Sequence, residues 1–480
     1  MAVIADTYSF MINGQAIAAA QTFEVKNPAT GELIGHAPIS SPEQVAQAVA
    51  AARAAQPAWA AKSDEERKEI LQKVAQVLSE NTEYLAKWIT QEQGKPMAGP
   101  GSMFEMQACL GWTQVPASLD LPVEVVFEDD SRRDELHRRP IGVIGAISPW
   151  NWPLMIAIWQ IIPSLRTGNT VVIKPSEYTP IGTLEMVRLM NTVLPAGVLN
   201  TISGDGSVGA HLVQNQDVDK IMFTGSTRTA RKIIEASGGN MARLTLECGG
   251  NDPAIILPGT QMASRAGDLF WGAFINMGQT CACAKRLYVH EDDYQQVVTA
   301  LDSVAGQMPM GNGMEEGIVL GPIQNQMQFD KVNELVEDAK SNGASIIRGG
   351  SPMGGSGHFY PITLVGDIDN GARLVDEEQF GPVLPIIRYK TVEEAIQKAN
   401  DTTTGLGASV WGDDLEAAAK VAARIESGTV WINQHGTIHP MVPFGGMKDS
   451  GYGVEFGVEG LKAVTQPQVI SIKKAATAEA

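Results

Sequence analysis

The sequence predicts an α/β protein with two mainly parallel sheets and a small additional β element. From Ile141 onward, short β-branched runs alternate with helical segments, and strands are expected at residues 141–147, 170–173, 199–202, 221–224 and 244–246. A second alternating series predicts strands near residues 286–290, 345–348, 384–388, 409–411 and 429–432. Because strands that alternate with helices are joined by right-handed crossovers, each series predicts one parallel sheet covered by helices.

The additional β element is predicted by a charged segment that precedes the first series of strands. Residues 121–139 read LPVEVVFEDDSRRDELHRR, which is typical of a hairpin with a polar turn at residues 128–131. We expect this hairpin to project from the body of the protein.

The N-terminal part of the chain carries the start signals of surface helices. Ser41 can cap a helix whose first position is Pro42, and Ser63 with Glu66 forms a capping box. Apolar residues then repeat at helical spacing between residues 70 and 78. Gly94 is expected to end this helical run.

Composition limits the possible partners and compartments. The 480 residues are several times the length of one ordinary domain and predict two or three structural units. With 36 Lys and Arg against 54 Asp and Glu, the formal net charge of −18 disfavours nucleic acid and anionic lipid as partners. Four cysteines are too few for a disulfide framework, and no secretory signal is recognisable, so we expect a cytoplasmic protein. The longest apolar stretch, residues 153–162, is too short to cross a membrane.

Two segments suit phosphate binding at the start of a helix. Residues 204–209 match the pattern GxGxxG after a strand, but Thr224 stands where an acidic ribose ligand would be expected. A stronger candidate is FTGS at residues 223–226, where Gly225 turns the chain and Ser226 precedes a helix with free N–H groups. Each pattern is weak when taken alone.

A lysine and a glutamate are expected at the edge of the first sheet. Lys174 ends the apolar run TVVIK, and Pro175 prevents the strand from continuing. Lys174 and Glu177 should therefore lie at the carboxyl ends of parallel strands, where nucleotides bind. Solvated surface charge is the simpler interpretation of both.

Three further segments carry residue types that suit acyl chemistry. Asn151 lies in the turn SPWNWP after a strand, and a side-chain amide beside a backbone N–H can stabilise an oxyanion. Glu247 ends an apolar strand before two glycines, where desolvation can raise its pKa toward that of a general base. Cys281 lies in FINMGQTCACAKR, one residue away from a second cysteine. Each also has a structural interpretation: a proline-bounded turn, a solvent-facing carboxylate and a buried inert thiol.

The joint order of these segments resembles the aldehyde dehydrogenase superfamily. SPWN, KPSE, FTGS, LECGG, GQTC, EEQFGPV (residues 377–383) and PFGGMKDSG (residues 443–451) occur in the order and at the approximate spacing of that family. The resemblance runs from NPATG at residues 27–31 to the last expected strand. It implies a Rossmann-like cofactor domain (residues 1–119, 140–249 and 450–465), an α/β catalytic domain (250–449) and a small β oligomerisation element (120–139 and 466–480).

The resemblance implies oxidation of an aldehyde to the carboxylate with NAD, through a cysteine thiohemiacetal and a thioester. Cys281 matches the nucleophile, Glu247 the base that activates water, and Asn151 the side-chain half of the oxyanion site. The implied cofactor-binding residues are Trp150, Lys174, Glu177, Gly225, Ser226, Glu378 and Phe380. Glu177 would repel a 2′-phosphate on the ribose, so NAD is expected to be favoured, with NADP possible.

Three positions vary from the family pattern or carry no fixed role in it. Ala230 stands where a glycine is usual, and it is small enough to keep close helix packing. Asn251 replaces a common lysine, and the sequence offers no account of it. Cys283 falls at a variable position, where it is expected to be a bystander or a redox partner of Cys281.

The expected substrate tunnel is apolar. Its predicted lining comprises Trp152, Met155, Trp159, Thr280, Ile438 and Phe444. Semialdehyde-specific relatives carry an arginine near the position of Trp159, and none is found there, so an apolar or aromatic aldehyde is favoured. His435 and His439 keep open a route to a polar or acidic substrate; they are too few ligands for a metal site, and no metal is expected.

Two alternatives remain open. The spacing of Cys281 and Cys283 resembles that of succinate-semialdehyde dehydrogenases, which would make a semialdehyde the substrate. A non-catalytic binding or structural protein of the same fold is opposed by the joint presence of nucleophile, base, oxyanion amide and cofactor residues. The resemblance also implies a homodimer or homotetramer, because the hairpin and the strand near residues 468–472 would otherwise leave sheet edges exposed.

Overall fold

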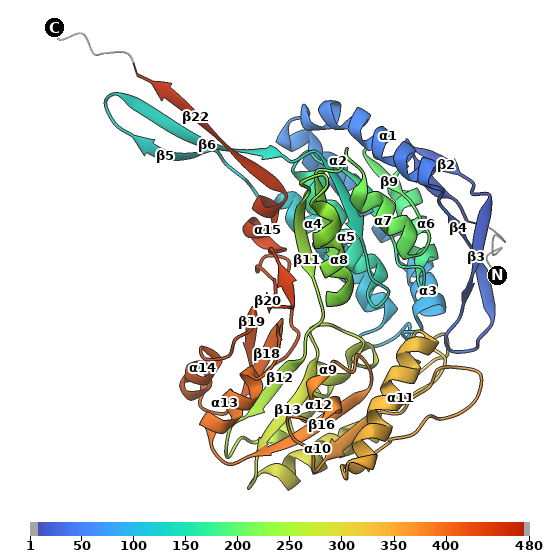
Figure 1. Ribbon diagram of the computed structural model, residues 1–480, viewed down its shortest axis with the longest axis vertical. Coiled ribbons are helices and arrows are strands. Elements are labelled where there is room, and N and C mark those ends of the chain that lie inside the picture. The colour runs from blue at the N-terminus through green and yellow to red at the C-terminus, as the bar shows by residue number, and fades with distance from the viewer. Residues whose placement is uncertain (1–7, 475–480) are drawn as a thin grey trace.

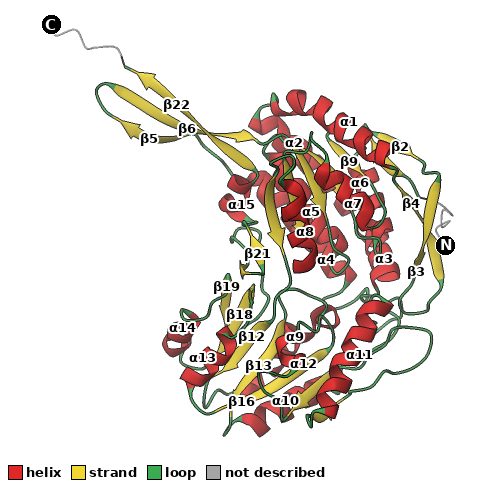
Figure 2. Ribbon diagram, viewed as in Figure 1, coloured by secondary structure: helices red, strands yellow, loops and turns green. Residues whose placement is uncertain are grey.

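The computed structural model describes residues 8–474 and contains two sheets with flanking helices and a projecting arm (Figures 1 and 2). Residues 1–7 and 475–480, which the sequence analysis assigned to the cofactor domain and the last β element, lie outside the described residues.

The first sheet has a reversal of strand order beside its central strand. It comprises β7 (Val143–Ile147), β8 (Thr170–Lys174), β9 (Leu199–Thr201), β10 (Lys220–Thr224), β11 (Arg243–Glu247) and β21 (Gly451–Tyr452), in the order β21-β11-β10-β7-β8-β9. All neighbours are parallel except β11 and β21. Because β8 and β9 lie on one side of β7 and β10 and β11 on the other, the carboxyl ends of β7 and β10 form the switch point where such sheets bind ligands.

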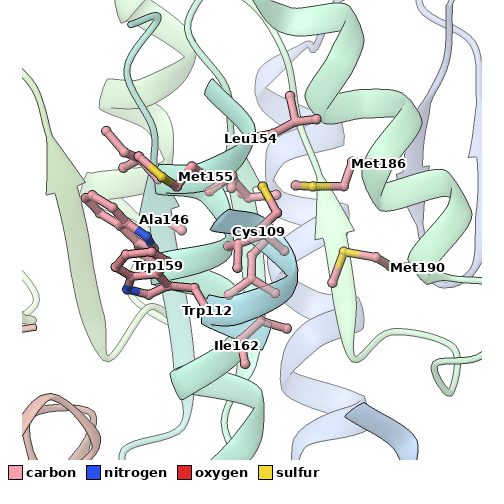
Figure 3. Close-up of a cluster of buried hydrophobic side chains, with 14 of the residues drawn as sticks. Cys109, Trp112, Ala146, Leu154, Met155, Trp159, Ile162, Met186 and Met190 are labelled. Atoms are coloured by element: carbon pink, nitrogen blue, oxygen red, sulfur yellow. The ribbon is translucent and has the colours of Figure 1, made fainter. Parts of the chain in front are cut away.

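Two cores cover the two faces of this sheet. The surrounding helices are α1 (Pro42–Ala60), α2 (Asp64–Glu80), α3 (Thr82–Gln93), α4 (Ser102–Ser118), α5 (Pro153–Arg166), α6 (Pro180–Met190), α7 (Gly206–Gln214), α8 (Thr227–Ser237) and α15 (Gly457–Ala463). Ile144 and Met222 point into a core shared with α2, α4 and α5, part of which is shown in Figure 3. Val143 and Ile221 point into the opposite core, shared with α1, α7 and α8. This alternation is the side-chain period of a strand buried on both faces.

The second sheet is also mainly parallel. It comprises β12 (Asp252–Ile256), β13 (Ala284–His290), β14 (Ser345–Arg348), β15 (Thr363–Gly366), β16 (Val383–Tyr389), β18 (Gly407–Trp411) and β19 (Thr429–Ile432), in the order β14-β15-β16-β13-β12-β18-β19. Its helices are α9 (Ala266–Phe274), α10 (Tyr294–Ala305), α11 (Gln326–Ser341), α12 (Arg373–Asp376), α13 (Val392–Asn400) and α14 (Leu415–Ala422), with short 3₁₀ turns at Met262–Ser264 and Ile275–Gly278. Only the β14–β15 pair is antiparallel.

A three-stranded antiparallel arm extends away from the body in Figure 1. It consists of β5 (Glu124–Glu128), β6 (Arg132–Pro140) and β22 (Thr465–Lys473), with β6 in the centre. Several of its apolar side chains are exposed, among them Val126, Phe127 and Val469. The remaining strands form two-stranded ribbons: β1 (Phe10–Ile12) with β2 (Gln15–Ile17), β3 (Gln21–Lys26) with β4 (Leu33–Ile39), and β17 (Thr404–Gly405) with β20 (Met447–Lys448).

The predicted α/β class, both series of strands and the hairpin are confirmed. The helical run expected to end at Gly94 is two helices, because the backbone leaves the helical conformation at Asn81 (φ −113°, ψ 14°). The prediction omitted β12 and β15, and it did not foresee that β14 and β21 are antiparallel. Between residues 8 and 474, no helix is long and apolar enough to cross a membrane.

A buried ion pair attaches the start of α4 to the start of α5. Lys95 Nζ lies 2.6 Å from Glu105 Oε2, and both side chains are fully buried. Glu105 Oε1 accepts hydrogen bonds from the backbone N–H groups of Leu154 (2.9 Å) and Met155 (3.1 Å) in the first turn of α5. Lys95 Nζ also donates to the carbonyl oxygen of Asn151 (2.8 Å). The pair therefore holds the turn between β7 and α5 in place.

Lys95→Met should lower the free energy of unfolding by about 3–5 kcal/mol, because it leaves the Glu105 carboxylate buried without its cation. The double variant Lys95→Met/Glu105→Gln should lose clearly less, since it removes the isolated charge. Denaturant unfolding followed by tryptophan fluorescence would measure both. Equal losses in the single and the double variant would contradict this account.

Candidate active site

The loop that precedes Cys281 has an unusual backbone. Asn276, Met277 and Gly278 all adopt left-handed angles, with φ of 50°, 59° and 69°. A Cβ at Gly278 would lie 2.2 Å from the carbonyl oxygen of Gly381, so only glycine fits there. Side chains rarely adopt such angles, and their persistence requires contacts that hold them. The loop presents Cys281 at the start of the chain that leads into β13.

Asn151 is hydrogen-bonded to the loop of residues 276–280, which precedes Cys281 and is called the cysteine loop below. Asn151 Nδ2 donates to the carbonyl oxygen of Gln279 (2.9 Å), and Asn276 Nδ2 donates to the carbonyl oxygen of Asn151 (2.8 Å). Trp152 Nε1 donates to Thr280 Oγ1 (2.9 Å). An amide nitrogen carries two N–H groups, and within residues 8–474 Asn151 Nδ2 makes one hydrogen bond. One N–H is thus left to stabilise an oxyanion.

Glu247 lies at the end of β11, and the surrounding described residues donate no hydrogen bond to its carboxylate. It is buried, and both carboxylate oxygens lack a hydrogen-bond partner among the described residues. Burial, reinforced by the nearby Glu455 carboxylate, raises the pKa of Glu247 well above its ordinary value. Burial also raises the pKa of Glu455 to about 7, against the opposing charge of Lys220. A carboxyl whose pKa is raised binds a proton more readily than an ordinary glutamate does, which suits a general base.

The Cys281 thiol lies among carboxylates. Burial raises its pKa most, and the charges of Glu247, Glu378 and Asp252 raise it further, whereas Lys285 lowers it. A thiolate is the reactive form of cysteine, so this environment disfavours the reactive form of Cys281 unless a proton acceptor or a positive charge acts on it.

The residues expected to hold the cofactor follow strands of the first sheet. Gly225 and Ser226 follow β10 at the switch point, and Ser226 Oγ caps α8 by accepting from the backbone N–H of Thr229 (3.2 Å). Lys174 is buried at the end of β8, with Nζ 3.9 Å from Glu177 Oε2. A helix start with free N–H groups suits a pyrophosphate, and a lysine–glutamate pair suits ribose hydroxyls. The set fits a dinucleotide.

A second group reaches this edge from the other sheet. Glu378 Oε1 accepts from the backbone N–H of Gly250 (3.2 Å), and a Cβ at Gly249 would lie 2.2 Å from Glu378 Oε2. The rings of Trp150 and Phe380 meet edge to face, with centroids 5.4 Å apart. Glycine at position 249 therefore permits the approach of Glu378.

The weaker phosphate candidate, residues 204–209, lies after β9 at the outer edge of the sheet. Asp205 caps α7 there, its carboxylate accepting from the backbone N–H of Ser207 (2.9 Å). An anion already occupies this helix start, which makes it a poor site for a second one.

The model of the aldehyde dehydrogenase family matches residues 16–470. The chain belongs to this family. It is 35% identical to phenylacetaldehyde dehydrogenase of Pseudomonas fluorescens, over 97% of this chain and 96% of that protein.

Two solved structures extend the comparison. An NAD+ complex of aldehyde dehydrogenase from Bacillus cereus aligns with a TM-score of 0.95 at 32% identity, covering 98% of both chains. Betaine aldehyde dehydrogenase of Staphylococcus aureus, also with NAD+, aligns with a TM-score of 0.93 at 31% identity, covering 97% of this chain and 94% of that one. The protein is therefore an NAD(P)-dependent enzyme acting on aldehydes, in agreement with the predicted reaction class.

A cavity of about 730 Å³ in this aldehyde dehydrogenase reaches Cys281. Of the predicted lining residues, Trp152, Met155, Trp159, Thr280 and Ile438 line it. Phe444 does not; its ring stacks on Phe456 (centroids 5.9 Å apart, 21° between planes) and packs in the core.

The sequence analysis missed the wall that α4 and α9 provide. Phe104, Ala108 and Trp112 line the cavity from α4, and Trp271 lines it from α9. Trp112 and Trp159 lie beside each other (centroids 5.5 Å apart; Figure 3). The spacing of the α4 residues, four apart, was the available signal for a helix face.

The structure explains Asn251, for which the sequence offered no role. Asn251 Nδ2 donates to the carbonyl oxygens of Val375 (2.8 Å) and Asp376 (3.3 Å), which ties the start of β12 to the segment leading to Glu378. Ala230 is buried on α8, as close packing requires. Cys283 is fully buried and free. Among residues 8–474, no group of three or more His, Cys, Asp or Glu side chains is placed to hold a metal.

Glu247→Gln should stabilise the enzyme increasingly as the pH rises. The raised pKa means that the folded wild type holds a proton that the unfolded chain releases above about pH 4.5. Wild-type stability therefore falls with pH, by up to about 1.4 kcal/mol per unit, until the folded carboxyl ionises. Glutamine removes this dependence.

The measurement is the difference in thermal unfolding midpoint between the variant and wild type at pH 5 to 8. It should grow with pH, whereas Glu316→Gln, a change at an exposed glutamate, should show a constant difference. A constant difference for Glu247→Gln would refute the assigned protonation.

Proposed function

We propose that this enzyme oxidises an apolar or aromatic aldehyde to the carboxylate with NAD, using Cys281 as nucleophile. The observation that carries the proposal is that an aromatic cavity ends at Cys281, where Asn151 and Glu247 also converge. In the first half-reaction the Cys281 thiolate forms a bond to the aldehyde carbon. The carbonyl oxygen becomes an anion, which the free N–H of Asn151 and the backbone N–H of Cys281 stabilise.

Lys174, Glu177, Ser226 and Glu378 would hold NAD, which would supply the acceptor for the hydride that leaves this carbon. A thioester on Cys281 would remain. Glu247, in its ionised form, then takes a proton from a water molecule whose oxygen attacks the thioester carbon. The tetrahedral species collapses, the carbon–sulfur bond breaks, and the products are the carboxylic acid and the Cys281 thiolate. The acid then releases its proton to water and becomes the carboxylate. The unsolvated carboxyl of Glu247 suits this role because its raised pKa makes it a competent proton acceptor.

The roles proposed for the remaining regions follow the same arrangement. Residues 1–119, 140–249 and 450–465 would bind the cofactor and residues 250–449 would carry the nucleophile. Glu177 supports a preference for NAD, because its carboxylate would repel the 2′-phosphate of NADP. The exposed apolar side chains of the arm support a homodimer or homotetramer, since an isolated three-stranded sheet leaves edges unpaired.

The residues that line the cavity support the proposal that the tail of the aldehyde substrate is uncharged. Among its described lining residues none is a lysine or an arginine, whereas Asp268 is present. A buried semialdehyde carboxylate would find no lysine or arginine there, only the imidazoles of His435 and His439, and it would be repelled by Asp268, at a cost of several kcal/mol. A second candidate is a quaternary ammonium aldehyde, because Trp112, Trp159 and Trp271 offer ring faces for a cation and Asp268 offers a negative charge.

Glu247→Gln should still acylate but should not release product. Rapid mixing with aldehyde and NAD should give a burst of NADH close to one per active site, followed by steady turnover lowered by about 10²–10⁴-fold. Cys281→Ser should show neither phase, because a hydroxyl is hardly ionised near neutral pH. Normal steady turnover in either variant would contradict the assigned roles.

The substrate class should appear in a comparison of kcat/KM values with NAD and with NADP. Phenylacetaldehyde, benzaldehyde and hexanal should exceed succinic semialdehyde by at least tenfold, equal to about 1.4 kcal/mol of transition-state preference. Betaine aldehyde tests the second candidate. Preference for the semialdehyde would refute the uncharged tail, and preference for NADP would refute the cofactor assignment.

A further inference from the structure

Lys285 is a buried lysine that lies four residues after Cys281 and contacts the cysteine loop. It is the second residue of β13 and is 1% exposed. Its Nζ donates to the carbonyl oxygens of Gly278 (2.9 Å) and Thr280 (2.6 Å). The same ammonium lies 5.0 Å from the centroid of the Phe380 ring. All three contacts belong to segments that form the proposed site.

Within the described residues, Lys285 forms no ion pair with a carboxylate. Among residues 8–474, no carboxylate oxygen lies within 4.0 Å of its Nζ. Lys95 provides the contrast: it too donates to a backbone carbonyl and lies over an aromatic ring, that of Trp152, but it is paired with Glu105. A buried ammonium without an ion pair is expensive, and here two carbonyl dipoles, a ring face and the more distant charge of Glu378 compensate it.

We propose that Lys285 is a positioning residue of the cysteine loop whose charge, which is not engaged in an ion pair, favours the thiolate of Cys281. The inference rests on the proposed function, in which Cys281 is the nucleophile. It adds a residue that lies outside the set of nucleophile, base and oxyanion amide.

The positioning part follows from the backbone of the loop. Three consecutive residues, 276–278, are left-handed, and the carbonyl groups that Lys285 binds lie at the end of this segment and directly before Cys281. Asn276 is held by Asn151, as described above. Lys285 holds the other end, so the two contacts together fix the backbone N–H of Cys281 relative to the Asn151 amide.

The electrostatic part follows from the charges that act on Cys281. The carboxylates come from three elements: Glu247 from the end of β11, Asp252 from β12 and Glu378 from the segment before β16. All three oppose the thiolate, and Lys285 from β13 is the cation that acts in the opposite direction. The low polarity of a buried site strengthens each of these interactions. Loss of the cation would leave the three carboxylates unopposed.

The test is the pH dependence of Cys281 alkylation by iodoacetamide, without aldehyde or NAD, in a Cys283→Ala background so that one thiol of the loop reacts. In Lys285→Met the midpoint of the alkylation rate should rise by about one pH unit, which makes alkylation about tenfold slower below the midpoint. Lys285→Arg, which keeps the charge, should stay within about 0.3 unit of the parent.

Lys331→Met is the matched control. Lys331 Nζ donates to the carbonyl oxygen of Glu378 (2.6 Å) and acts on that carboxylate, but it is not among the main charges that shift the pKa of Cys281. In Lys331→Met, the midpoint of the alkylation rate against pH should equal that of the parent. Thermal unfolding identifies folded variants, and if Lys285→Met does not fold, Lys285→Gln replaces it, because its amide can still donate to the loop carbonyls.

An unchanged midpoint of the pH dependence of alkylation in folded Lys285→Met or Lys285→Gln would overturn the proposal. This holds even if the alkylation rate fell at every pH, because displacement of the loop without a charge effect would change the rate but not the midpoint. Failure of the proposed function would look different. A parent enzyme that does not oxidise aldehydes, or whose Cys281→Ser variant does, would refute the nucleophile without altering the alkylation midpoints.

Discussion

The site depends on the mutual hydrogen bonds between Asn151 and the loop before Cys281. Asn151 follows a strand of the first sheet, and the loop precedes a strand of the second, so each is positioned by a different core. Amide groups suit this junction because each offers donors and an acceptor and remains neutral when buried. A displacement of one sheet relative to the other by the length of a hydrogen bond would separate the Asn151 amide from Cys281, the proposed nucleophile.

The junction also explains why so much charge is buried around it. Glu247, Glu378 and Asp252 all raise the pKa of Cys281, which keeps the thiol protonated until the site is complete. The same burial raises the pKa of Glu247, so that its carboxyl can take a proton from water. A solvated site would weaken both effects, since interactions between charges fall as the local polarity rises. The cost in stability is offset by the two large cores on either side.

The sequence predicted the parts of the fold that depend on local pattern. Alternating strands and helices, the hairpin and the residues at the ends of β7, β8, β10 and β11 could all be found from periodicity and from Pro or Gly stops. Contacts that arise only in three dimensions could not. Phe444 lies in a segment of the expected tunnel, but its ring turns into the core beside Phe456, and Asn251 acquires a role only because α12 folds back against it. From the sequence alone, Lys285 cannot be distinguished from an ordinary exposed lysine, and only the structure shows that it is buried.

Helix α4 contacts the proposed substrate cavity with one face and the turn that carries Asn151 with another. Phe104, Ala108 and Trp112 form the face that lines the cavity, whereas Glu105 points to the start of α5 and holds the turn that carries Asn151. One rigid element thus carries both functions on different faces, because residues four apart share a face and adjacent residues do not. Changes on the cavity face alter the shape available to the aldehyde tail without removing a buried charge. A change at Glu105 would disturb the oxyanion amide while leaving the aromatic wall intact, so loss of rate and change of specificity should arise from adjacent positions of the same helix.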